Sequence, residues 1–197
     1  MQVPAPGVRV TVYVGIDPGV HACGIAASDK YAMLGALWAR TDTKDALAED
    51  VAEAALRGLR LAVQSRPSVR NDELVIGIEF PEVTRDRARG EAKTEDLLDL
   101  SFAVGRVFEH LKTKLPGAHL LRLQVSTWKH NVKTEVLAKR LLGMVPPMGL
   151  SLAETKNVTW PADSYRHNVV DAIAISRWLR DWPARNPSKN LKDFARL

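Results

Sequence analysis

The first forty residues contain three apolar runs whose connections are too short to hold a helix. The first run, residues 9–17, alternates and is rich in β-branched side chains, which is typical of a strand. Pro18-Gly19 breaks it, and the runs 22–28 and 32–39 follow with a polar turn between them. Because consecutive strands joined by such short turns pair antiparallel, the sequence predicts a three-stranded meander.

Helical and strand patterns alternate after this meander. Residues 74–80 are apolar almost throughout, as an interior strand should be, and residues 119–125 predict a fifth strand. The fold class expected is therefore α/β, with a five-stranded mixed sheet (a three-strand antiparallel meander plus two parallel strands) and helices on both faces. Apolar spacing predicts helices at 43–65, 91–115, 127–142 and 166–180, with an irregular stretch at 146–165.

The composition fits one ordinary globular domain. The chain has 197 residues, of which 46% are hydrophobic and 26% are charged. We expect this domain to span residues 1–183 and residues 184–197 to form a basic tail. The sequence has no apolar run of membrane-spanning length, no secretory signal pattern and a single cysteine, Cys23. These features predict no membrane partner and a cytoplasmic location, in the host cytoplasm if the chain is phage-encoded.

Three acidic residues stand in apolar surroundings. Asp17 ends the first predicted strand, Glu79 lies near the end of the fourth, and Asp171 lies in an apolar helical stretch. A buried carboxylate without a counter-charge is costly, and converging carboxylates raise one another's pKa unless a cation neutralises them. We therefore predict a site for a pair of divalent metal ions, and hard oxygen ligands favour Mg²⁺ or Mn²⁺.

Each acid also has an ordinary structural explanation. Asp17 before Pro-Gly could form a turn, and Glu79 could end a strand at the surface. Asp171 could pair with Arg166 or Arg177. The prediction of a metal site therefore rests on all three acids together.

A fourth ligand is expected on the helix that carries Asp171. His167 stands four residues earlier and projects from the same helix face, so it is the candidate ligand or proton carrier. Asn168, three residues earlier, is the competing candidate.

The acids lie in motifs that resemble the RuvC-type Holliday junction resolvases of the RNase H-like superfamily, especially phage-type members. Gly15-Ile-Asp17-Pro-Gly19 followed by Gly24-Ile-Ala resembles their opening hairpin. Ile78-Glu79 is similar to their second acidic strand, and His167-Asn-Val-Val-Asp171-Ala-Ile-Ala to their closing metal-binding helix. The predicted element order matches the RNase H-like fold across residues 9–181.

The resemblance implies roles for the site residues and a two-metal hydrolysis of phosphodiester bonds. Asp17 would bridge two metal ions, Glu79 and Asp171 would bind one each, and His167 would complete the set. The family often places this last ligand three residues before the final Asp, where this chain has Asn168.

The resemblance also implies a homodimer that grips a four-way DNA junction and nicks two opposed strands symmetrically, leaving 5′-phosphates. The net charge of +5 suits a polyanionic partner. The helix at 91–115 is the expected dimer surface, through a second apolar stripe of Leu100, Val107 and Leu111. The alternatives are another RNase H-like nuclease, acting on RNA–DNA hybrids or flaps, and a non-catalytic nucleic-acid-binding relative.

Basic side chains near the acids are candidate DNA contacts. The stretch 85–93 follows Glu79 and could lie on phosphates, although a solvated polar loop explains it equally well. Trp128-Lys129 with Lys133 adds a weaker match to the family, at the start of a predicted helix. The predicted DNA-binding residues are Arg85, Arg87, Arg89, Lys93, Lys129, Lys133 and Arg166.

Overall fold

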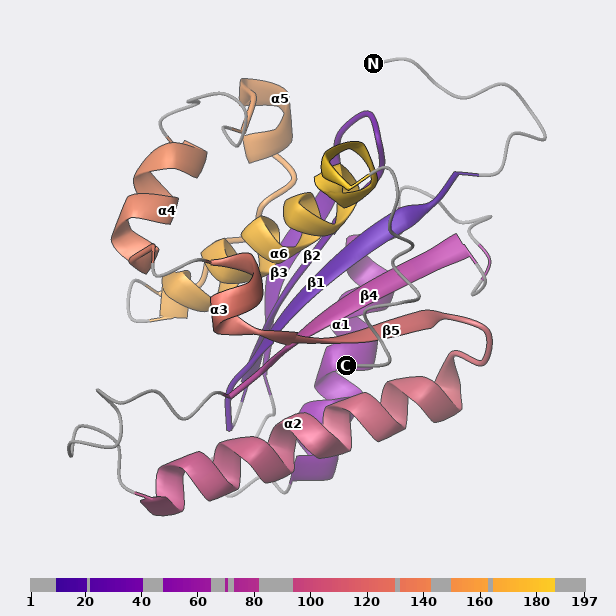
Figure 1. The fold of residues 1–197 in the computed structure, drawn as a ribbon, viewed down its shortest axis with the longest axis vertical. Helices are drawn as coiled ribbons and strands as arrows, with labels where there is room; N and C mark the ends of the chain where they lie inside the picture. The colour runs from indigo at the N-terminus through magenta and orange to yellow at the C-terminus, as the bar shows by residue number, and fades with distance from the viewer. Residues whose placement is uncertain are drawn as a thin grey trace.

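A five-stranded mixed sheet forms the centre of the fold (Figure 1). The structure, a computed structural model, describes residues 10–20, 22–40, 48–64, 70, 73–81, 94–129, 132–142, 150–162 and 165–186. The strands are β1 (Val12–Pro18), β2 (Ala22–Ser28), β3 (Met33–Arg40), β4 (Leu74–Phe80) and β5 (His119–Gln124). Their order is β3-β2-β1-β4-β5, with β1–β2 and β2–β3 antiparallel and β1–β4 and β4–β5 parallel. The predicted sheet is confirmed.

Helices cover both faces of this sheet, as predicted. They are α1 (Ala48–Ala62), α2 (Thr94–Lys114), α3 (Val125–Trp128), α4 (Thr134–Leu142), α5 (Leu152–Thr155) and α6 (Arg166–Arg185). Helices α1 and α2 pack on one face, and α3 to α6 lie on the other (Figure 1). In the described part of the chain, no helix combines the length and apolar character needed to span a bilayer.

The helix predicted at 127–142 is in fact two helices, α3 and α4. The backbone N–H of Lys129 donates a hydrogen bond to the carbonyl of Val125 at 2.9 Å and closes α3, and α4 begins only at Thr134. This break allows Trp128 and Leu137, from different helices, to be buried together against α6. Burial of both side chains explains why the continuous helical pattern was misleading.

The stretch predicted to be irregular, 146–165, contains the short helix α5. The Ser151 hydroxyl accepts a hydrogen bond from the Glu154 backbone N–H at 3.2 Å, and the Glu154 carboxylate accepts one from the Ser151 N–H at 2.9 Å. This is a capping box, and its Ser-x-x-Glu pattern is readable in the sequence.

The last helix continues beyond its predicted end at Arg180. α6 includes Pro183 in its last turn, where a proline removes only one backbone donor. The rings of Trp178 and Trp182 pack with centroids 4.8 Å apart and support this turn. Residues 184 and 185 of the predicted tail therefore belong to α6, while residues 187–197 lie outside the described residues.

The residues predicted to form an exposed apolar stripe for a dimer surface are not exposed. Val107 and Leu111 are fully buried in the core, because this side of α2 packs on the sheet and α1, and Leu100 is half-buried against the same core. The exposed apolar side chains of α2 are Leu98 and Phe102, one turn apart, with exposed fractions of 64% and 66%.

Helix α6 rests directly on the sheet because two glycines face it. A Cβ on Gly24 would lie 2.0 Å from the backbone oxygen of Asn168, and a Cβ on Gly15 would lie 2.1 Å from that of Ala172. No side chain larger than hydrogen fits at either position without moving the helix. These glycines therefore set the position of the helix that carries Asp171.

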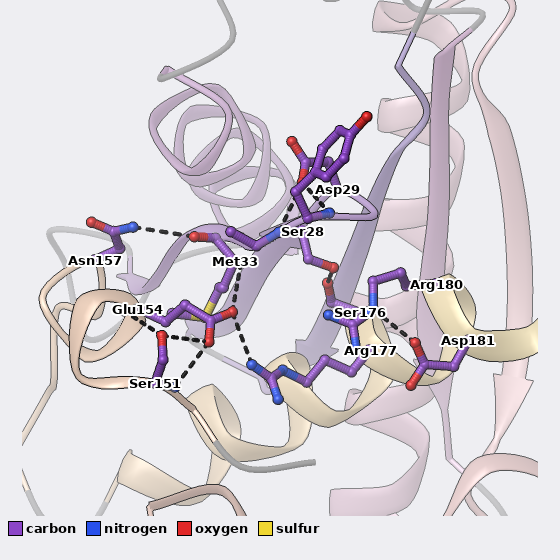
Figure 2. Close-up of polar contacts among 12 residues, drawn as sticks. Ser28, Asp29, Met33, Ser151, Glu154, Asn157, Ser176, Arg177, Arg180 and Asp181 are labelled. Carbon is purple, nitrogen blue, oxygen red and sulfur yellow. Dashed lines mark hydrogen bonds and ion pairs between the residues drawn. The ribbon is translucent and has the colours of Figure 1, made fainter. Parts of the chain in front are cut away.

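A buried polar network holds α6 farther along its length (Figure 2). The Arg177 guanidinium, only 4% exposed, lies 3.0 Å from a carboxylate oxygen of Glu154. That oxygen also accepts a hydrogen bond from the backbone N–H of Met33 at 2.8 Å, which ties α5 to β3. The hydroxyls of Ser28 and Ser176 lie 2.6 Å apart and join β2 to α6. Since losing one partner of a buried ion pair is strongly destabilising, this network fixes α6 against the sheet.

Gly24→Ala should lower the free energy of unfolding, because the new methyl group would collide with the backbone of α6. We expect a loss of about 1–3 kcal/mol or more, measured by urea denaturation. Gly105→Ala in α2 is the matched control, since its Cβ would meet nothing within 4 Å. That change should stabilise the protein by up to about 1 kcal/mol through helix propensity. Equal effects of the two changes would contradict the close packing.

Candidate active site

Two of the three predicted acids lie on adjacent strands at the same end of the sheet. Asp17 is the penultimate residue of β1 and Glu79 that of β4, and Ile16 pairs with Ile78 in parallel register. Their side chains therefore leave the sheet on one face, which is the face that α6 covers. Asp17 is 8% exposed, so its carboxylate is largely removed from water.

The third acid comes from α6. Asp171 is 5% exposed and lies three residues after Asn168, whose carbonyl rests on Gly24. Gly24 is the β2 partner of Asp17, so the first turns of α6 lie over the end of β1 that carries Asp17. The close packing of α6 thus brings Asp171 toward the two strand acids.

The electrostatics of Asp17 report this convergence directly. Burial raises the pKa of Asp17 well above its ordinary value of 3.8, and the negative charges of Glu79 and Asp171 raise it further. The ammonium of Lys129 acts in the opposite direction. The three acids, which are far apart in the sequence, therefore share one electrostatic site.

Lys129 is the counter-charge that the sequence did not assign. Its Nζ lies 2.6 Å from Oδ2 of Asp171, with side-chain exposures of 11% and 7% for the two residues. The interpretation of Asp171 as a partner of Arg166 or Arg177 is wrong for Arg177, which binds Glu154 instead. The sequence did hold a signal for this pairing. β5 runs parallel to β4, so Lys129, which follows β5, comes at the same end of the sheet as Glu79.

The donor set of this site fits divalent cations in charge and chemistry. Three carboxylates face one ammonium, so the negative charge is only partly neutralised by Lys129. Carboxylate oxygens are the ligands that Mg²⁺ and Mn²⁺ prefer. Within the described residues, no three or more His, Cys, Asp or Glu side chains already form a metal-binding group. Lys129 and a bound cation would compete for the Asp171 carboxylate.

The two candidates for the fourth ligand differ in burial. His167 is exposed, whereas Asn168 is only 9% exposed. The Asn168 side-chain nitrogen would lie 3.7 Å from a Cβ on Gly19, at the end of β1. The amide of Asn168 is thus the group that approaches the loop after Asp17.

The predicted DNA-binding residues fall into three groups. Lys133 and Arg166 are exposed, and Arg166 lies with its guanidinium carbon 5.4 Å from the centroid of the Trp160 ring. Lys129 is turned inward to Asp171. The others lie outside the described residues: Arg85, Arg87, Arg89 and Lys93.

Comparison with solved structures identifies the fold. Thermus thermophilus RuvC in complex with a Holliday junction substrate has a TM-score of 0.52 at 17% identity, covering 89% of this chain and 95% of that one. T. thermophilus RuvC alone gives 0.54 at 17% identity, covering 90% and 98%. The yeast mitochondrial Holliday junction resolvase gives 0.55 at 14% identity, covering 93% and 82%.

These similarities confirm the RNase H-like fold and a structural likeness to the RuvC and yeast resolvases. No family model and no curated protein matches the sequence. Because a fold hosts many functions, the activity has to be argued from the site.

In the presence of EDTA, the contribution of Asp17 to the free energy of unfolding should fall as the pH rises from acid to neutral. The folded protein binds the Asp17 proton more tightly than the unfolded chain, because the pKa of Asp17 is raised above 3.8. This stabilisation is fully present below the unfolded pKa and is lost as the pH rises through the folded pKa. Asp17→Asn has no such proton, so the free energy of unfolding measured by urea denaturation should fall less, or rise more, with pH in the variant than in the wild type. An identical slope would contradict the buried, shared site.

Proposed function

We propose that the chain is a structure-selective endodeoxyribonuclease that resolves four-way DNA junctions by symmetric paired nicks, using two Mg²⁺ or Mn²⁺ ions. The observation that carries the proposal is the convergence of Asp17, Glu79 and Asp171 at one end of the sheet. Carboxylates so gathered can hold two divalent ions about 4 Å apart, the arrangement that supports in-line phosphodiester hydrolysis. The three acids therefore support metal-dependent hydrolysis, which similarity of fold alone would not do.

The residues of the site would have different roles in the proposed reaction. Asp17, Glu79 and Asp171 would hold the ions. When bound, the ions would supply Lewis-acid activation of the phosphodiester and of the attacking water. Burial of Asp17 and Asp171 keeps bulk water away and strengthens each electrostatic interaction. Lys129, once released from Asp171, would present its ammonium to a phosphate oxygen.

The substrate proposed is a four-way DNA junction. One structure with this fold, T. thermophilus RuvC, is in complex with a Holliday junction substrate, which supports this choice. Exposed Lys133 and Arg166 would contact phosphates, and so would the basic stretch 85–93. Hydrolysis that leaves 5′-phosphates would allow the nicked arms to be religated.

A homodimer follows from the need to cut two strands symmetrically. Leu98 and Phe102 stand one turn apart on α2 and expose most of their side chains. We propose that this pair packs against its copy in a second chain, because exposed apolar neighbours of this size favour self-association.

Asp17→Asn should abolish nicking of a labelled four-way junction in Mg²⁺ while preserving junction binding in EDTA. The amide keeps the shape of the carboxylate but removes the charge that holds the metal ions. The loss in rate should exceed the roughly 10- to 100-fold that removal of an outer-shell partner causes. Asp99→Asn, an exposed aspartate on α2, is the matched control and should nick normally.

The same assay, run on linear duplex, a flap and an RNA–DNA hybrid, tests the substrate. Equal cutting of linear duplex would contradict junction selectivity, and faster cutting of the hybrid or flap would assign the other RNase H-like activity. Junction binding without any nicking would identify a non-catalytic relative.

A comparison of the single variants His167→Ala and Asn168→Ala tests which residue is the fourth metal ligand. With His167 as ligand, its loss should raise the Mn²⁺ concentration needed for half-maximal nicking by about 10- to 100-fold, and Asn168→Ala should raise it less. A larger effect of Asn168→Ala would contradict His167 and assign the position to the buried amide.

A further inference from the structure

An aromatic stack lies beside the candidate active site, formed by two residues that are far apart in the sequence. The rings of Trp38 and Tyr165 have centroids 4.6 Å apart and an interplanar angle of 20°. Trp38 is half-buried and packs against the core beneath α6, whereas Tyr165 is 46% exposed. One face of the Tyr165 ring rests on Trp38, and nearly half of the area of Tyr165 is exposed to solvent. Trp38 therefore backs a ring that is presented to solvent.

The sheet register places this stack on the same row as the catalytic carboxylate. Asp17 pairs with Gly24, and Gly24 pairs with Trp38, so the three residues lie side by side on adjacent strands. Paired residues point to the same face, here the face covered by α6. Two strand spacings separate Asp17 and Trp38 by roughly 10 Å. Tyr165 is the N-cap of α6, the helix that carries Asp171.

One guanidinium group lies against a ring of this stack, and a second belongs to Arg166, the residue that follows Tyr165 in the sequence. The guanidinium carbon of Arg40 lies 5.6 Å from the centroid of the Trp38 ring, and that of Arg166 lies 5.4 Å from the Trp160 ring. Both arginines are exposed at the surface. An exposed ring next to cations is the chemistry that binds single-stranded nucleic acid, since bases stack on the ring and phosphates lie on the cations.

Core packing alone does not account for the geometry of Tyr165. An aromatic ring that only fills the core is mostly buried, and its contribution comes from the apolar area removed from water. Tyr165 instead keeps nearly half of its area in solvent while its ring is held parallel to Trp38. The ring is therefore held against Trp38 while nearly half of the residue's area stays in contact with solvent.

We propose that Tyr165, backed by Trp38, is a stacking platform for an unpaired base of the DNA strand that enters the active site. Arg40 and Arg166 bind the phosphates that flank this base. The inference rests on the proposed function for the identity of the strand. A paired base within a duplex has both faces covered by its neighbours, so the platform selects DNA whose bases are splayed apart.

The test measures binding of a short oligothymidylate in EDTA, by fluorescence anisotropy, against an abasic oligomer of equal length. Tyr165→Ala should weaken oligothymidylate binding by about 5- to 150-fold, because base–aromatic stacking is lost. Binding of the abasic oligomer should stay unchanged, since its phosphates still contact Arg40 and Arg166. Tyr165→Phe keeps the ring and should bind both oligomers like the wild type.

Tyr31 offers a matched control at the opposite end of the sheet. It is 41% exposed and carries its own cation, since Lys30 Nζ lies 4.7 Å from the ring centroid. Tyr31→Ala should leave binding of both oligomers unchanged. The platform is refuted if Tyr165→Ala has no effect, if it weakens both oligomers equally, or if Tyr31→Ala weakens the oligothymidylate as much.

This test is independent of catalysis, because it requires neither metal nor nicking. A protein that passes it but never nicks junctions would refute the proposed nuclease and keep the stacking platform. A protein that nicks junctions but fails it would keep the nuclease and lose the platform.

Discussion

The repulsion among three converging carboxylates is the constraint on which the rest of this structure depends. Asp17, Glu79 and Asp171 would each be better solvated apart, and the raised pKa of Asp17 reflects what it costs to keep them together. The fold opposes this repulsion with rigid packing. Glycines let the α6 backbone touch the sheet, and the Arg177–Glu154 ion pair holds the helix farther along. Lys129 neutralises part of the charge, which leaves a site prepared for a stronger cation.

The parts of this site that lie on strands could be predicted from the sequence. β2 and β4 have the predicted bounds, because each is a continuous apolar run between turn residues. An acid at the end of such a run is conspicuous, and Asp17 and Glu79 were identified in this way. Asp171 was identified because it interrupts an apolar helical face.

The parts that depend on tertiary packing could not be predicted. The break between α3 and α4 turns Lys129 inward to Asp171, and helical periodicity does not encode that turn. Phe80 packs edge-on against Phe108 because its face of β4 meets α2, a contact between distant segments. The stack of Trp38 on Tyr165 joins an edge strand to the start of α6. Because the two residues are far apart in the sequence, no local pattern predicts their contact.

The central claim is that the three acids share bound divalent cations, and anomalous diffraction from crystals grown with Mn²⁺ tests it most directly. The account predicts anomalous density in contact with oxygens of Asp17, Glu79 and Asp171 together, at coordination distances of about 2.0–2.3 Å. It also predicts that the Lys129 ammonium moves away from Asp171. The absence of such density at saturating Mn²⁺, or an ion held by a single carboxylate with Lys129 unmoved, would contradict it.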